Sequence, residues 1–142
     1  MLRMFPLLII PIIVYNMFAF GGGVVAHGDV HTLLITTTSI PMFSGQRWDI
    51  SFGDFLLMLT LLLLFAEIIK ATHTTSKELI NHGLSMLVFV VALIEFITVK
   101  GFANSVFFFI MAMTLFDTMA GYTISIVAAE HDLGLGKAGT DR

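Results

Sequence analysis

The sequence predicts an all-α integral membrane protein: a bundle of four transmembrane helices with a short, hairpin-like external loop. Apolar residues make up 57% of its 142 residues and charged residues only 12%, whereas soluble domains have about 45–50% and about 25%. The mean hydropathy is +0.96. A chain this short cannot hide so much apolar surface in a water-soluble core. We therefore expect one membrane domain, residues 1–142, with the lipid bilayer as its solvent.

The charge pattern and the missing cysteines exclude several functional classes. The formal net charge is -3, without a basic run, so nucleic acid is not an expected partner. The absence of cysteine excludes disulfides, thiolate metal sites and cysteine nucleophiles. No Ser/His/Asp arrangement and no phosphate-binding glycine loop is recognisable, which favours a protein that is not an enzyme.

The first apolar segment, residues 2–26, is long enough for a membrane helix, which needs about 20 residues. Two prolines interrupt it and predict a kink near Pro11, and the glycines at 21–23 end its apolar run. Arg3 at its start and the small residues at 24–26 also resemble a secretory signal. We interpret the segment as an uncleaved anchor helix.

Further apolar runs predict helices at residues 54–71, 76–99 and 104–129. Ser51 and Asp54 have the spacing of a capping box before the first of these runs, and Thr75 and Glu78 have it before the second. The links between the last three helices are short, so these helices should lie antiparallel to their neighbours.

The distribution of basic residues predicts the orientation in the membrane. In a four-helix arrangement, five of them fall on one side, namely Arg3, Lys70, Lys77, Lys137 and Arg142. Two, Arg47 and Lys100, fall on the other. The excess of Lys and Arg marks the cytoplasmic side. This predicts the plasma (inner) membrane, both termini cytoplasmic, and a cytoplasmic tail at 130–142.

The external loop, residues 27–53, has the pattern of a hairpin. The β-branched run 30–38 and the segment 48–52 flank a turn at Ser44 and Gly45. A two-stranded hairpin is marginal in water. It therefore needs support from the helices, the membrane surface or another chain.

A short histidine and aspartate pattern in this loop suggests a metal site. In an extended chain, His27, Asp29 and His31 would share one face, and such ligands could hold a divalent metal such as zinc or copper. No other cluster supplies the further ligands that zinc generally needs. The alternative is a hydrated loop with two histidines by chance, and no other cofactor is expected.

Three carboxylates, Glu67, Glu95 and Asp117, lie inside apolar runs, where a charge is costly and faces other helices or a wet cavity. Carboxyl groups desolvated in a bundle can exchange protons near neutral pH, which would allow a proton relay or cation path. Alternatively, Glu67 pairs with Lys70, Glu95 reaches toward Lys100, and Asp117 is a protonated packing contact. A third interpretation is that these side chains contact another protein.

The fourth predicted helix also has a close-packing pattern. Gly121, Ser125 and Ala129 form a row of small residues four apart, which lets helices approach closely. Of the five histidines, only His82, one turn into the third helix, is placed to be buried.

Small size and the lack of a complete catalytic set favour a non-enzymatic accessory or scaffolding subunit of a larger membrane assembly. Its partners would be other membrane subunits or a second copy of itself. The alternative is an oligomeric proton or cation channel or transporter that uses Glu67, Glu95 and Asp117. A membrane enzyme with a metal at His27 is a third hypothesis.

Overall fold

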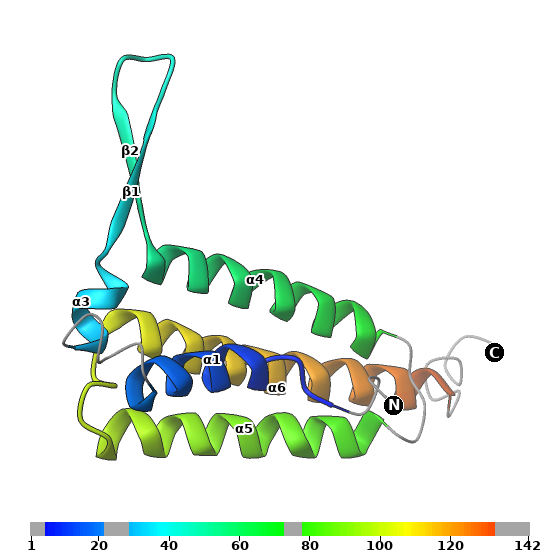
Figure 1. Cartoon of the computed structure of the whole chain (residues 1–142). Helices are drawn as coiled ribbons and strands as arrows, with labels where there is room; N and C mark the ends of the chain where they lie inside the picture. The colour runs from blue at the N-terminus through cyan, green and yellow to red at the C-terminus, as the bar shows by residue number, and fades with distance from the viewer. Residues whose placement is uncertain (1–4, 22–28, 73–77, 133–142) are drawn as a thin grey trace, which may run out of the picture.

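The computed structural model describes residues 5–21, 29–72 and 78–132. Its elements in chain order are α1 (Ile9–Phe20), α3 (Val30–Leu34), β1 (Thr37–Pro41), β2 (Arg47–Ser51), α4 (Phe52–Ala71), α5 (Glu78–Thr98) and α6 (Ser105–Asp132). The long helices lie side by side, and the two strands project from one end of them (Figure 1). We call this end the hairpin end. The opposite end, where α1 begins and α6 ends, is the terminal end.

Helix α6 is the centre of the bundle, because it packs against both α4 and α5. Helix α1 contacts α4 and α6, and in the view of Figure 1 it lies between α4 and α5, roughly along the same direction. Helices α4, α5 and α6 run alternately toward and away from the hairpin end, as the short links predicted.

Three of the helices are long and apolar enough to cross a membrane, over Phe52–Ala71, Asn81–Thr98 and Ser105–Val127. Large apolar side chains such as Leu62, Leu87 and Phe116 point outward. Polar side chains of the same helices are buried between them. An apolar outer surface with polar side chains buried between the helices fits a membrane location.

Helix α1 is shorter than predicted. It has 12 residues, or about 18 Å at about 1.5 Å per residue, which is less than the hydrocarbon core of about 30 Å. Pro11 lies in its first turn, where its missing N–H breaks no helical hydrogen bond. Pro11 therefore stands at the start of a helix and does not kink a longer one. Residues 2–4 and 22–26 of the predicted span lie outside the described residues.

The hairpin forms, but its first part differs from the prediction. Residues Val30–Leu34, predicted as the start of a strand, form the short helix α3, whose residues Val30, Leu33 and Leu34 are buried. Strands β1 and β2 pair antiparallel, from Thr37 opposite Ser51 to Pro41 opposite Arg47. Gly45 has a φ of 81°, which glycine adopts at no steric cost. The predicted turn at Ser44 and Gly45 is thus confirmed.

The capping box before α4 is also confirmed. Ser51 Oγ accepts a hydrogen bond from the Asp54 N–H at 3.0 Å, and an Asp54 carboxylate oxygen accepts one from the Ser51 N–H at 2.9 Å. Because Ser51 is also the last residue of β2, the hairpin passes directly into α4. The other predicted cap, Thr75, lies outside the described residues.

The apolar core at the hairpin end surrounds Tyr15. Its ring lies 4.9 Å from that of Phe102 and 4.7 Å from that of Phe107. The Tyr15 hydroxyl donates to the Gly101 carbonyl at 3.0 Å and accepts a hydrogen bond from Asn104 Nδ2. These contacts fasten α1 to the link between α5 and α6.

Candidate functional site

A buried polar cluster lies between α4, α5 and α6 toward the terminal end. Its members are Glu67, Lys70, Asn81, Ser85 and Asp117, and we call it the polar cluster. Glu67 is 2% exposed. Its carboxylate accepts hydrogen bonds from Asn81 Nδ2 at 2.8 Å and from the backbone N–H of Leu7 at 3.1 Å. It also forms an ion pair with Lys70 at 2.7 Å.

Lys70 extends the polar cluster to the segment that precedes α1. Its ammonium group donates to the Phe5 carbonyl at 2.9 Å and to Asn81 Oδ1 at 3.4 Å. Together, Glu67 and Lys70 therefore hold an N–H and a carbonyl of the same short backbone segment. Three segments far apart in sequence meet at these two side chains.

Asp117 enters the polar cluster from α6 and is 5% exposed. Its carboxyl group faces Ser85 of α5 and lies within electrostatic range of Glu67 and Lys70. Ser85 Oγ lies close enough to this carboxyl group to influence its charge state. The distance and angles between them nevertheless fall outside the limits of a hydrogen bond. Asp117 thus has a neighbouring carboxylate but none of the three donors that surround Glu67.

Gly121 lets α5 and α6 approach closely beside the polar cluster. A Cβ atom at Gly121 would collide with Nδ1 of the buried His82. The Tyr122 ring lies 6.0 Å from the His82 ring, measured between centroids. Ser125, the next residue of the predicted small-residue row, is half-buried, and the Ala129 side chain lies outside the described part of the chain.

Glu95 lies near the hairpin end, away from the other two carboxylates. Both of its carboxylate oxygens accept from Asn16 Nδ2 at 3.1 Å, so the contact joins α1 to α5. On α5, the buried residues Val88 and Ala92 separate it from Ser85. Among the described residues, the partner of Glu95 is therefore Asn16, and the predicted reach toward Lys100 is absent.

Three buried threonines lie on α4 and α6 at intermediate depth, but their hydroxyls are used within their own helices. Thr60 donates to the Leu56 carbonyl at 2.7 Å. Thr114 donates to Met111 at 2.6 Å, and Thr118 donates to Thr114 at 3.0 Å. They do not bridge helices.

The predicted metal site is not assembled within the described residues, which contain no group of three potential ligands. Asp29 precedes α3 and His31 is an exposed residue on it, so the extended geometry assumed for their alternation is wrong. His27 lies outside the described residues.

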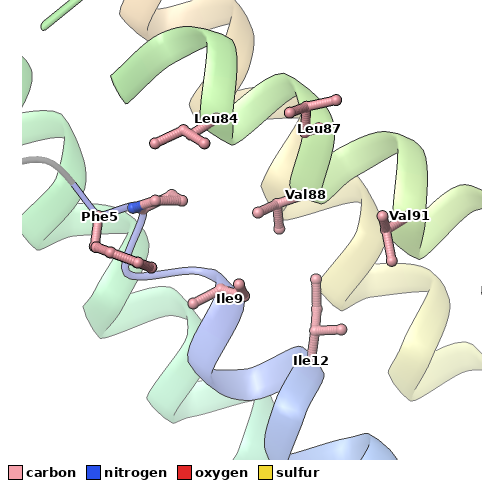
Figure 2. A pocket seen from close by; sticks show the side chains of 8 residues that line it. Phe5, Ile9, Ile12, Leu84, Leu87, Val88 and Val91 are labelled. Carbon is pink, nitrogen blue, oxygen red and sulfur yellow. The ribbon is translucent and has the colours of Figure 1, made fainter. Parts of the chain in front are cut away.

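An apolar groove of about 220 Å³ opens between α1 and α5. Ile9 and Ile12 of α1 face Leu84, Val88 and Val91 of α5 across it (Figure 2). Only apolar side chains line it, so the groove offers no group for chemistry.

Sequence reasoning found Glu67, Lys70 and Asp117 but missed the partners that complete the arrangement. Asn81, Ser85 and Asn16 are polar residues in apolar helices, and this signal was available. The Leu7 N–H had no such signal, because a backbone donor cannot be recognised from the residue type.

Comparison of the chain with family models, with curated proteins and with solved structures gives no match in any of the three.

Proposed function

We propose that this chain is a non-enzymatic accessory subunit of a larger membrane protein assembly, and that its hairpin binds the partner. The single observation that carries the proposal is the uncovered apolar face of the hairpin. The partner would be another membrane protein subunit with an apolar surface at the same membrane face.

The register of the hairpin separates apolar from polar side chains. Because side chains alternate along a strand, residues that pair across the ladder share a face. One face carries Thr38, Ile40, Trp48 and Ile50. The opposite face carries Thr37, Ser39, Pro41, Arg47, Asp49 and Ser51. The hairpin is therefore amphipathic, with a Ser39–Asp49 hydrogen bond on its polar face.

The described chain leaves the apolar face open. Trp48 is 50% exposed, and Ile40, Met42 and Phe43 at and near the tip are also exposed. The hairpin projects sideways from the start of α4, across the direction of the helices and away from them (Figure 1). An amphipathic two-stranded hairpin is marginal in water, so a second surface that covers its apolar side would stabilise it.

The intramembrane carboxylates give less support to the alternative, a proton or cation channel. Glu67 and Glu95 are bonded to residues of their own chain, and the apolar residues Val88 and Ala92 lie between the two positions. The same internal bonds speak against these carboxylates as contacts to another protein.

We further propose the membrane topology that the basic residues favour, with the hairpin outside and both termini cytoplasmic. In this arrangement α1 is a fourth and shorter membrane helix. The hydrogen bonds of α1 to Glu95 and to the link at Gly101, and that of the preceding Leu7 to Glu67, support its inclusion in the bundle.

Two chemically identical residues on opposite faces of the hairpin allow a matched test. A photo-crosslinking amino acid is placed at Thr38, on the apolar face, or at Thr37, on the polar face. Both variants are irradiated in the native membrane, and the cross-linked products are identified by mass spectrometry. We expect one defined membrane protein to cross-link at Thr38 much more strongly than at Thr37.

A second variant tests whether the apolar face holds the assembly together. The double substitution Ile40→Ser and Trp48→Ser should lower the mass of the native complex after mild extraction, because the partner is lost. Thr37→Ala should leave this mass unchanged. Cross-links to lipid alone, or to a second copy of this chain alone, would contradict the proposal. An unchanged native mass in the double variant would also contradict it.

A further inference from the structure

The polar cluster has an imbalance of charge that is independent of the proposed function. Within the described residues, two carboxylates, Glu67 and Asp117, face a single ammonium group, that of Lys70. If both carboxylates were ionised, these three groups would together carry one unbalanced negative charge. Such a charge is costly inside a membrane-spanning bundle, so the cluster favours the uptake of one positive charge.

The contacts of the two carboxylates differ in a way that selects the site of uptake. Glu67 receives hydrogen bonds from Leu7 N–H and Asn81 and an ion pair from Lys70. Donors of this kind stabilise an ionised carboxylate. Asp117 has no comparable set of donors among the described residues, and it is as deeply buried as the apolar core residues. Among the described residues, the donors that suit a carboxylate are therefore gathered at Glu67 and not at Asp117.

Ser85 is a possible hydrogen-bond partner for a proton on Asp117. It is 2% exposed and lies beside the Asp117 carboxyl, and among the described residues its hydroxyl has no partner within hydrogen-bond geometry. A buried hydroxyl can either donate or accept. The Ser85 oxygen can thus accept a hydrogen bond from a protonated Asp117.

We propose that Asp117 is a proton-binding site, and that the folded protein holds one proton there at neutral pH. With this proton on Asp117, Glu67 and Lys70 remain an ion pair without net charge. The Asp117 side chain is then a neutral hydrogen-bond donor toward Ser85. The charged groups that act on this site are Glu67 and Lys70 on α4. The next titratable groups are His82 on α5 and Tyr122 on α6, which lie beside each other near Gly121, one helical turn beyond Asp117. The described residues before α1 contribute none.

Infrared spectroscopy of the full chain in lipid vesicles tests the proposal without a mutation. A protonated carboxylic acid has a carbonyl-stretch band that an ionised carboxylate lacks. We expect this band at pH 7, and we expect it to shift when the protein is made with aspartate labelled with ¹³C at the side-chain carboxyl. If labelled glutamate shifts the band instead, the proton is on a glutamate such as Glu67 or Glu95 and the proposal is wrong. If no band is present, Asp117 is ionised and the proposal is also wrong.

Variants distinguish the other candidate carriers of charge. Asp117→Asn should remove the band, and Glu67→Gln should also remove it, because Asp117 can then balance Lys70. His82→Asn should leave it unchanged, and loss of the band in this variant would contradict the proposal. Spectra in sodium and in choline buffers should agree, since a band that vanishes in sodium would mean that this cation occupies the site.

The proton also predicts the direction of a pH effect on stability. An unfolded aspartate is ionised at neutral pH, so the folded chain binds one proton more than the unfolded chain. The free energy of unfolding must then fall as the pH rises. The unfolding equilibrium constant should rise about tenfold per pH unit while Asp117 keeps its proton, and this rise should be absent in Asp117→Asn. An equal rise in both proteins would contradict the proposal.

Discussion

Asn81 Nδ2 donates a hydrogen bond of 2.8 Å to Glu67 Oε1 and thereby joins α5 to α4 inside the bundle. Both residues are buried. The Asn81 side chain also accepts from Lys70, so it satisfies a carboxylate and an ammonium group at once. Asn81 therefore stabilises the fold by giving both charged groups a polar partner in place of water.

Replacing Asn81 by alanine should therefore destabilise the protein by about 1–3 kcal/mol, the usual effect of leaving a buried polar group unsatisfied. The matched control is Asn16→Ala, which removes the corresponding bond to Glu95. Glu95 is only half-buried, so that substitution should cost less. Unfolding in mild detergent measures both, and an equal or larger loss in Asn16→Ala would contradict this ranking.

Two glycines within helices provide a pair of opposite predictions. A Cβ atom at Gly121 would collide with the His82 ring, whereas one at Gly83 meets nothing within 4 Å. Gly121→Ala should destabilise by about 1–3 kcal/mol through overpacking, and Gly83→Ala should stabilise by up to about 1 kcal/mol through helix propensity.

A double-mutant cycle assigns the Gly121 effect to its cause. If the His82 ring is the obstacle, Gly121→Ala should cost much less in a His82→Ala background. Unfolding free energies of the four proteins give the coupling. Additive effects would show that the close approach of α5 and α6 does not depend on this ring.

The long helices and the cap before α4 could be predicted because they depend on local features. An apolar run of about 20 residues defines a span, and Ser51 and Asp54 lie three residues apart, the spacing of a capping box. The hairpin turn was likewise predicted from Ser44 and Gly45. These features need no knowledge of what the segment contacts.

The features that were predicted wrongly or missed depend on contacts between distant segments. The β-branched residues at 30–34 favoured a strand, but strand propensity is a weak preference, and Val30, Leu33 and Leu34 are buried as a short helix. One of the donors to Glu67 is the backbone N–H of Leu7, which lies 60 residues away in the sequence. No pattern along the chain predicts such a pair.

The capping box should matter for the joint between the hairpin and the membrane helix. Ser51→Ala should cost about 1 kcal/mol, because the Asp54 N–H loses its acceptor. Asp54→Ala removes the reciprocal bond, so the double variant should lose less than the two single losses together.

Hydrogen exchange provides the measurement for this cap. Amide protection should fall at the first turn of α4 in Ser51→Ala and remain unchanged at its last turn. Thr72→Ala, which removes an exposed hydroxyl at the other end of α4, is the control. Fraying at both ends in Ser51→Ala would indicate a general loss of stability and contradict a local role for the cap.

Lys70 and Glu67 should behave as a unit. Removing one partner of a buried ion pair typically costs about 3–5 kcal/mol, whereas replacing both by neutral groups is often tolerated. Lys70 is part-exposed, so Lys70→Met should cost less than a fully buried partner would. Even so, it leaves the Glu67 carboxylate without its counter-charge, and it releases the Phe5 carbonyl. Combining it with Glu67→Gln should restore part of the lost stability, since the amide carries no charge and its one oxygen can still accept from either Asn81 or Leu7. Unfolding measurements on the single and double variants test this coupling, and a double variant less stable than Lys70→Met alone would mean that the Glu67 charge has another partner.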